Sequence, residues 1–146
     1  MAAVDGFDQV VEQYHLALGE FFKGNPEAAK KIFSHQDDVT LANPFGPPAR
    51  GWEQVAETME RAASNYRDGE VRFEPAARSV TSELAYTVEM ERCQAKVGGR
   101  GDAASLALRV TTIFRPEEGT WKVVPQAFLR SPLFTRVNWV YCKTTV

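Results

Sequence analysis

Two polar side chains, Tyr14 and Asn43, stand where a folded chain could present them to a bound molecule. Asn43 precedes Pro44 after a short apolar segment, and Asn-Pro starts a turn because proline bars the preceding residue from the helical region. Asn43 is therefore expected at a strand end beside a loop, where functional residues are common. Its alternatives are a structural role in the turn and a hydrogen bond to a ligand. Tyr14 lies on an apolar helical stripe, so its hydroxyl either bonds to the backbone in the core or points into a cavity.

Charged side chains within the later strands are a second candidate set. Glu89 and Glu91 are two residues apart, so they share one face of a strand, and Arg109 is expected to face them. An arginine opposite two like charges relieves their repulsion. The pattern predicts a solvated or dimer-facing ion pair, with Arg109 binding a carboxylate ligand as the alternative. A register shift of one residue would make Glu89 or Glu91 a candidate base.

Trp52, His15 and the cysteines give weaker indications. Trp52 begins a predicted helix, where core packing is its ordinary role and roofing a cavity is the alternative. His15 falls off the apolar stripe and is expected at the surface. Two histidines and two cysteines without clustering do not predict a metal site.

Hydrophobic periodicity predicts the elements that position these residues. Apolar residues spaced three, four and seven apart indicate helices, and a short strand is expected before Asn43. The third helix is expected to be closed by Asp68 and Gly69. The predicted helices cover residues 7–22, 26–33 and 52–66, and the short strand covers residues 39–42.

After Gly69 the period changes to two, which indicates strands. Pro75 interrupts the first of them and predicts an edge strand or a bulge. In the second, the core face is expected to carry leucine, tyrosine, valine and methionine, with the glutamates opposite. The predicted strands cover residues 70–80, 84–97, 105–115 and 120–129. Three helices followed by an antiparallel meander predict an α+β fold.

Composition restricts the class of protein. A chain of 146 residues fits one domain, and a net charge of -2 with interspersed signs offers no footprint for nucleic acid or an anionic membrane. No apolar run approaches the roughly 20 residues of a spanning helix, so no membrane partner is expected. The N-terminal residues lack the pattern of a signal peptide, and a reduced cytoplasm is the expected compartment.

The order of the segments resembles the nuclear transport factor 2-like superfamily, which includes the SnoaL-like polyketide cyclases and ketosteroid isomerase. The resemblance extends from residue 7 to about residue 124. It implies a cone-like barrel of a strongly curved antiparallel sheet packed on three N-terminal helices, with a pocket inside and usually a homodimer through the sheet. The segments that carry it are residues 12–18, 39–46, 108–114 and 119–124.

The resemblance also implies roles for single residues. Ketosteroid isomerase has a tyrosine on its first helix that binds the substrate carbonyl, and Tyr14 matches it. The aspartate that serves as the isomerase's base is matched by Asn43, and its second acid falls at about Thr112. An amide cannot take a carbon-bound proton near neutral pH, and a hydroxyl stabilises an oxyanion less than a neutral carboxylic acid does. Isomerase chemistry of that kind is not expected, whereas a pocket is.

The C-terminal part departs from the family pattern. Relatives commonly continue after residue 124 with histidines directed at the pocket, whereas this chain has Pro125 and Gln126. We expect a SnoaL-like domain over residues 1–129 and a divergent tail over residues 130–146. The tail could be an added strand, a segment packed on a dimer partner, or the product of an altered reading frame.

These observations support one main functional hypothesis and two alternatives. The main hypothesis is a pocket that holds a small hydrophobic molecule without a cofactor and without an ionised acid. The first alternative is an isomerase-, cyclase- or dehydratase-like enzyme acting on a small hydrophobic cyclic substrate. The second is a homo-oligomeric association domain whose outer sheet face carries Glu89, Glu91, Thr111 and Ile113. The expected ligand-binding residues are Tyr14, Asn43, Trp52, Thr112 and Gln126.

Overall fold

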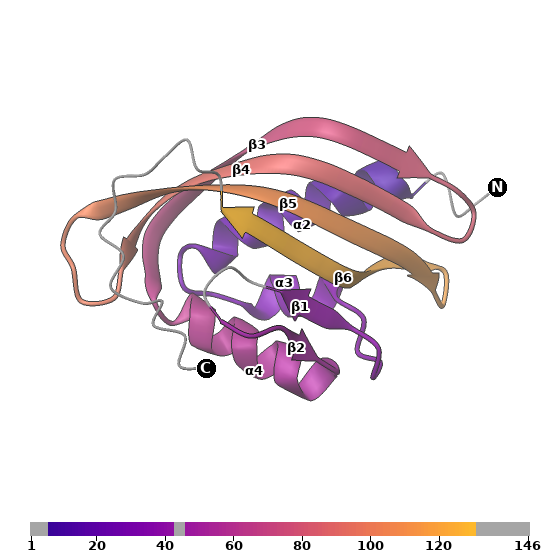
Figure 1. The fold of residues 1–146 in the computed structure, drawn as a ribbon, viewed down its shortest axis with the longest axis horizontal. Coiled ribbons are helices and arrows are strands. Elements are labelled where there is room, and N and C mark those ends of the chain that lie inside the picture. Colours follow the sequence, from indigo (N-terminus) through magenta and orange to yellow (C-terminus); the bar gives the residue numbers. More distant parts are fainter. Residues whose placement is uncertain (1–5, 43–45, 131–146) are drawn as a thin grey trace.

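A curved six-stranded sheet covers three helices in the computed structural model of the protein (Figure 1). The structure describes residues 6–42 and 46–130, with side chains up to residue 127. The predicted α+β fold, with its curved sheet packed on three helices, is confirmed. The helices are α2 (Phe7–Phe21), α3 (Glu27–Ile32) and α4 (Trp52–Ala63). The strands are β1 (Thr40–Ala42), β2 (Ala49–Arg50), β3 (Tyr66–Val80), β4 (Ala85–Val97), β5 (Ala103–Glu117) and β6 (Thr120–Arg130).

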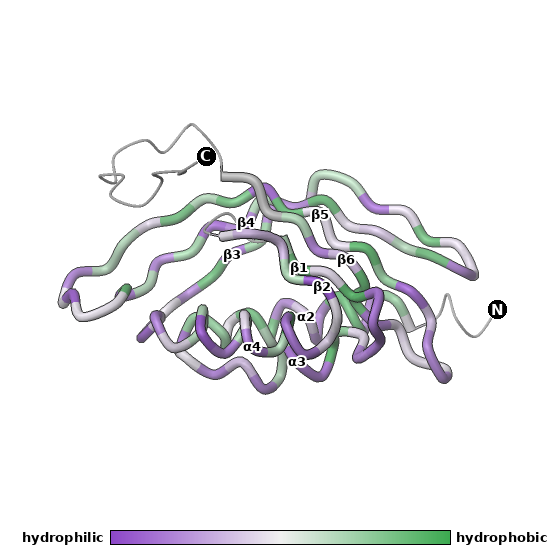
Figure 2. The backbone as a smooth tube through the Cα atoms, turned by 60° about the horizontal axis from the view of Figure 1, so that its bottom comes forward, coloured by the Kyte–Doolittle hydropathy of each residue, from purple (hydrophilic) through white to green (hydrophobic). Residues whose placement is uncertain are grey.

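The sheet is open, with strand order β2-β1-β6-β5-β4-β3. All neighbouring strands are antiparallel except β1 and β6, which run parallel. Figure 2 shows the helices together on one side of the sheet. The long strands β3 to β6 follow the three helices in the chain, and their concave side receives the N-terminal helix α2 (Figure 1). This topology brings Tyr14 and its neighbours on α2 close to residues of strands β4 to β6.

Helix α2 supplies much of the apolar core. Its buried residues recur at helical spacing, so a single face of the helix packs on the sheet. The Phe7 ring lies 5.1 Å from Phe114 of β5 and 5.3 Å from Trp121 of β6, both in edge-on geometry. Gly24, at φ 99°, follows the helix in a left-handed conformation, which costs glycine least.

The third helix is shorter than its apolar pattern predicted. Helix α4 ends at Ala63, and Tyr66 already pairs with Val97 at the start of β3. Asp68 and Gly69 therefore lie within β3, and the prediction that they close the helix is wrong. The apolar helical spacing continues to Tyr66, so the sequence could not show that Tyr66 pairs with a neighbouring strand instead of extending the helix. The short strand β2 was not predicted either.

The assignment of faces on β4 was also wrong. Residues directly opposite in an antiparallel pair project to the same side of the sheet. Glu89 is opposite Val110 and Glu91 is opposite Leu108, and all four are buried. The glutamates therefore face the helices. The other face of β4, with Tyr86 and its neighbours, is the outer face of the sheet.

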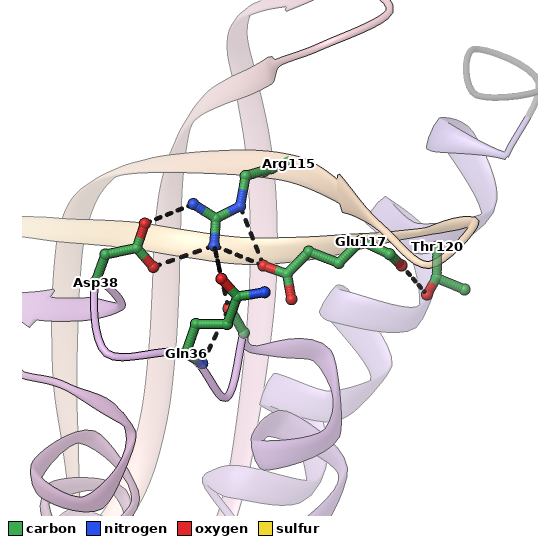
Figure 3. A network of polar contacts seen from close by, with 6 residues as sticks. Gln36, Asp38, Arg115, Glu117 and Thr120 are labelled. Atoms are coloured by element: carbon green, nitrogen blue, oxygen red, sulfur yellow. Dashed lines mark hydrogen bonds and ion pairs between the residues drawn. The ribbon is translucent and has the colours of Figure 1, made fainter.

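Arg115 near the end of β5 joins the sheet to the segment between α3 and β1 (Figure 3). Its guanidinium donates to Oδ2 of Asp38 at 2.6 Å and to Oε2 of Glu117 at 2.7 Å, and it also reaches Ser34 and Gln36. The Arg115 hydrogen bond lowers the pKa of the Asp38 carboxyl. These contacts hold the segment that leads into β1 against the end of β5.

Candidate functional site

Four polar side chains from one helix and three strands meet within the core. We call Tyr14, Glu91, Thr112 and Gln126 the inner polar cluster. The Tyr14 hydroxyl donates to Oε1 of Glu91 at 2.7 Å and accepts a short hydrogen bond from Nε2 of Gln126. The same Gln126 nitrogen lies 3.2 Å from Oγ1 of Thr112. All four side chains are buried, so their polar atoms depend on one another for hydrogen bonds.

A β-bulge places Gln126 in this cluster. Phe114 pairs with Val123 and Thr112 pairs with Gln126, so one residue of β5 stands opposite Val124 and Pro125 of β6. Val123 and Gln126 are both buried although they are three residues apart, which regular alternation would forbid. Pro125 lies in the bulge, where the absence of a backbone N–H is tolerated. The bulge therefore turns the Gln126 amide toward Thr112 and Tyr14.

Glu91 is the member of the cluster whose charge matters most. Its side chain is 0% exposed, and its Oε2 atom has no hydrogen-bond partner among the described residues. Burial raises the pKa of Glu91 to about 8, the Tyr14 hydrogen bond lowers it, and the nearby Glu89 raises it further. Glu91 is therefore mostly protonated at neutral pH. Burial and the same carboxyl also raise the pKa of the Tyr14 phenol well above its ordinary value.

Glu89 has a different set of partners. It lies two residues before Glu91 on the same face of β4 and is 5% exposed. Nε2 of His15 lies 3.0 Å from both Glu89 carboxylate oxygens. The His15 ring also stacks on Phe73, with centroids 3.8 Å apart and planes at 15°. A carboxylate only accepts hydrogen bonds, so Nε2 carries the proton here.

The structure brings together three of the five expected ligand-binding residues, Tyr14, Thr112 and Gln126. Asn43 lies outside the described residues. Trp52 is partly buried and stacks on His35, with ring centroids 3.7 Å apart, and it is not among the hydrogen-bonding residues of the inner polar cluster. Whether any of the five binds a ligand stays a prediction.

The principal residues that sequence reasoning misplaced are Glu89, Glu91 and His15. The glutamates were expected in an outer ion pair with Arg109, but Arg109 is exposed opposite Met90 on the other face. The expectation of an interior without a carboxylate was therefore wrong. His15 was expected at the surface, yet it contacts Glu89. The signal available was the alternation of Thr87, Glu89, Glu91 and Cys93, which forms one face as regular as the apolar one.

Within residues 6–42 and 46–130, no group of three or more histidine, cysteine, aspartate or glutamate side chains could hold a metal ion. None of the helices described is both long enough and apolar enough to cross a membrane.

The sequence of the chain matches a known protein family. The family model of the SnoaL-like domain matches residues 8–128, most of the chain. The chain belongs to the SnoaL-like domain family. The resemblance to the nuclear transport factor 2-like superfamily is thereby confirmed. Among curated proteins, none matches the sequence significantly.

Solved structures share the fold of this SnoaL-like domain at low sequence identity. A nuclear transport factor 2-like superfamily protein from Salmonella enterica serovar Typhimurium has a TM-score of 0.75 and 18% identity, over 94% of this chain and 96% of that one. A ketosteroid isomerase-like protein from Erwinia carotovora has a TM-score of 0.70 and 19% identity, over 85% and 96%. A Thiobacillus denitrificans protein, provisionally described as a calcium/calmodulin-dependent protein kinase type II association domain, has a TM-score of 0.70 and 13% identity, over 85% and 94%.

Proposed function

We propose that this SnoaL-like domain binds a small, largely apolar molecule that presents one acceptor oxygen, such as a carbonyl, to the inner polar cluster. The observation that carries the proposal is Oε2 of Glu91, which is buried beside Tyr14 and has no partner among the described residues. A protonated Oε2 is a hydrogen-bond donor, and a buried donor without an acceptor is costly. A ligand oxygen at this position would satisfy it.

The lining around the cluster favours an apolar ligand. Tyr14 packs with Phe73 and Phe114, whose ring centroids lie 6.4 and 6.3 Å from its own. Tyr14 and Glu91 are covered by neighbouring side chains, so a ligand reaches them only when these side chains move aside. A mostly apolar molecule with few polar groups is the ligand type that such a lining recognises.

Thermal unfolding with a panel of cyclic ketones and phenols tests this function. A compound at about 100 times its dissociation constant adds roughly 2.7 kcal/mol to the free energy of unfolding. We expect stabilisation of the wild type by at least one ring compound and a weaker effect on Tyr14→Phe, which lacks the phenol. Glu70→Gln, which changes an exposed side chain on β3, is the control and should respond like the wild type. Absence of stabilisation by every compound would contradict the proposal.

A second candidate function is proton transfer on such a ligand by an isomerase-, cyclase- or dehydratase-like mechanism. It is favoured by the pKa of about 8 at Glu91, because acid–base catalysis is most efficient when the pKa lies near the working pH. The similarity to a ketosteroid isomerase-like protein supports the same class. This candidate replaces the expectation, based on Asn43 and Thr112 alone, that the interior lacks a suitable acid.

Hydrogen exchange on ligand carbon atoms separates catalysis from binding. Cyclic ketones incubated with the protein in deuterated water should gain deuterium next to the carbonyl, as measured by NMR. The ionised fraction of Glu91 would accept the proton from carbon and return a deuteron to it. Glu91→Gln keeps a hydrogen-bond donor but has no ionised form, so we expect binding to persist while exchange falls by about 10²-fold or more. Equal exchange rates for wild type and Glu91→Gln would leave the domain as a binding protein only.

We also propose that the domain forms a homodimer through the outer face of its sheet. This face carries Tyr86, which is 37% exposed, and includes Thr111 and Ile113 as expected. Similarity to a protein described as an association domain supports this state. Light scattering should give a dimer for the wild type and a monomer for Ile113→Glu. Leu16→Glu on the exposed side of α2 is the control, and a monomeric wild type at all concentrations would refute the dimer.

Two further expectations remain part of the proposal. The division into a domain over residues 1–129 and a tail over residues 130–146 stays a prediction, because residues 131–146 lie outside the described part of the chain. A reducing cytoplasm stays the proposed compartment, and the free, buried thiol of Cys93 is compatible with it.

A further inference from the structure

Two carboxyl groups share the buried face of β4. Glu89 and Glu91 are alternate residues with 5% and 0% exposure, and each pairs with an apolar residue of β5, Val110 and Leu108 respectively. Negative charges at neighbouring inward positions of a buried strand face repel each other. Burial and, to a smaller extent, the nearby Glu89 raise the pKa of Glu91, so Glu91 retains its proton near neutral pH.

The hydrogen-bond partners of the two carboxyls are unequal. Glu89 receives the His15 N–H at 3.0 Å from both oxygens, and the side chain of His15 is 26% exposed, so water also reaches this imidazole. Glu91 receives only the Tyr14 hydroxyl on Oε1, and its Oε2 has no partner among the described residues. Donors stabilise a carboxylate, and a lack of donors favours the protonated acid.

Few other titratable groups face this pair. Helix α2 contributes Tyr14 and His15, and the next inward residue of β4 is Cys93, whose pKa burial raises to about 12. The β3 residues opposite Glu91 and Glu89 are Phe73 and Pro75, and neither carries a charge. Among the described residues, His15 is thus the one basic side chain that faces the pair.

We propose that the His15–Glu89 pair is a positioning device that keeps the negative charge on Glu89 and so holds Glu91 in its acid form. Stacking on Phe73 fixes the His15 ring in the plane that reaches both Glu89 oxygens. The negative charge on Glu89 then opposes ionisation of Glu91, and the Glu91 proton stays available to an acceptor oxygen. His15 and Glu89 act through Glu91 and need not touch the ligand. The proposal deepens the proposed function, because the acid form of Glu91 is what would meet that oxygen.

Carboxyl titration by NMR on ligand-free protein with ¹³C-labelled glutamate tests this assignment. In the wild type, Glu91 should titrate near pH 8. Glu89→Gln removes the opposing charge, and we expect the Glu91 midpoint to fall by about one pH unit or more. His15→Phe keeps an aromatic ring on Phe73 but removes the N–H donor. Without that donor the negative charge on Glu89 is less stabilised and opposes ionisation of Glu91 less, so the Glu91 midpoint should also fall.

The control is Glu70→Gln, which removes an exposed carboxylate from β3 and should leave the Glu91 midpoint unchanged. Circular dichroism shows whether each variant is folded, and the two variants at different positions keep the test valid if one of them unfolds. An unchanged Glu91 midpoint in the folded variants, or a wild-type Glu91 already ionised at pH 6, overturns the proposal. The titration uses no ligand, so its failure is distinct from a failure to bind cyclic ketones.

Discussion

The Tyr14 hydroxyl donates a hydrogen bond of 2.7 Å to Oε1 of Glu91, 77 residues further along the chain. Both side chains are buried, so this bond ties α2 to β4 inside the core. The same hydroxyl accepts from Gln126 of β6, which makes Tyr14 the residue that joins the strands of the inner polar cluster.

Removal of the Tyr14 hydroxyl should therefore destabilise the protein. Tyr14→Phe leaves Oε1 of Glu91 without its donor and takes one acceptor from Gln126. We expect the free energy of unfolding to fall by about 1–3 kcal/mol, the cost of buried polar groups left unpaired. Urea denaturation measures it. Glu70→Gln changes an exposed side chain of β3 and should change stability by less than about 0.5 kcal/mol. Equal effects of both changes would show that the Tyr14 bond contributes little.

The raised pKa of Glu91 predicts how stability depends on pH. Its pKa is about 8 in the folded protein against 4.5 for an ordinary glutamate, so between these values the folded state binds more protons than the unfolded state. The contribution of Glu91 is complete below about pH 4.5 and is lost as the pH rises to about 8. The slope approaches about 1.4 kcal/mol per pH unit.

Glu91→Gln isolates this contribution because the amide does not titrate. We expect the stability of the variant relative to the wild type to rise steadily from pH 5 to pH 8, as measured by urea denaturation at each pH. A constant difference between the two proteins would mean that Glu91 titrates alike in the folded and unfolded states.

Gly69 is predicted to be intolerant of substitution because β3 passes close to the end of α2. A Cβ at Gly69 would lie 2.4 Å from the Phe22 carbonyl oxygen and 2.6 Å from the Phe22 Cβ. Gly69→Ala should destabilise the protein by about 2 kcal/mol or more, since backbone must shift to make room. Gly101→Ala has open space around it and is the matched control. Thermal unfolding compares the two, and a similar melting temperature for both would disprove the contact.

Arg115 should contribute a stabilisation that depends on salt. Its guanidinium binds both oxygens of Asp38 at 2.6 and 3.1 Å, and also Glu117, in a partly exposed position (Figure 3). Arg115→Gln is expected to cost about 1 kcal/mol at low ionic strength and less in about 1 M salt. Arg115→Lys keeps the charge without the planar fork, so it should restore only part of the loss. A cost independent of salt would indicate packing by the side-chain stem instead.

The amino-acid sequence determined most of the elements of this fold. Local patterns carry that information, because apolar spacing of three and four residues defines the helical stripe of α2 and alternation defines the long strands β4 and β5. Pro75 also predicted an edge strand or a bulge, and β3 is the edge strand with a register shift between Pro75 and Ala77. The order of segments also led to the SnoaL-like domain family. Tyr14, Thr112 and Gln126 could be named from the sequence as candidates.

Only the tertiary structure decided which face of β4 is inside. Alternation separates Glu89 and Glu91 from Val88 and Met90 but does not say which set meets the helices, because that depends on pairing with β5. The register places Glu91 opposite Leu108 and brings it to Tyr14, so the interior contains a carboxyl where the composition of the faces predicted none. Burial then raises the pKa of that carboxyl, an effect created by distant residues that no local pattern records.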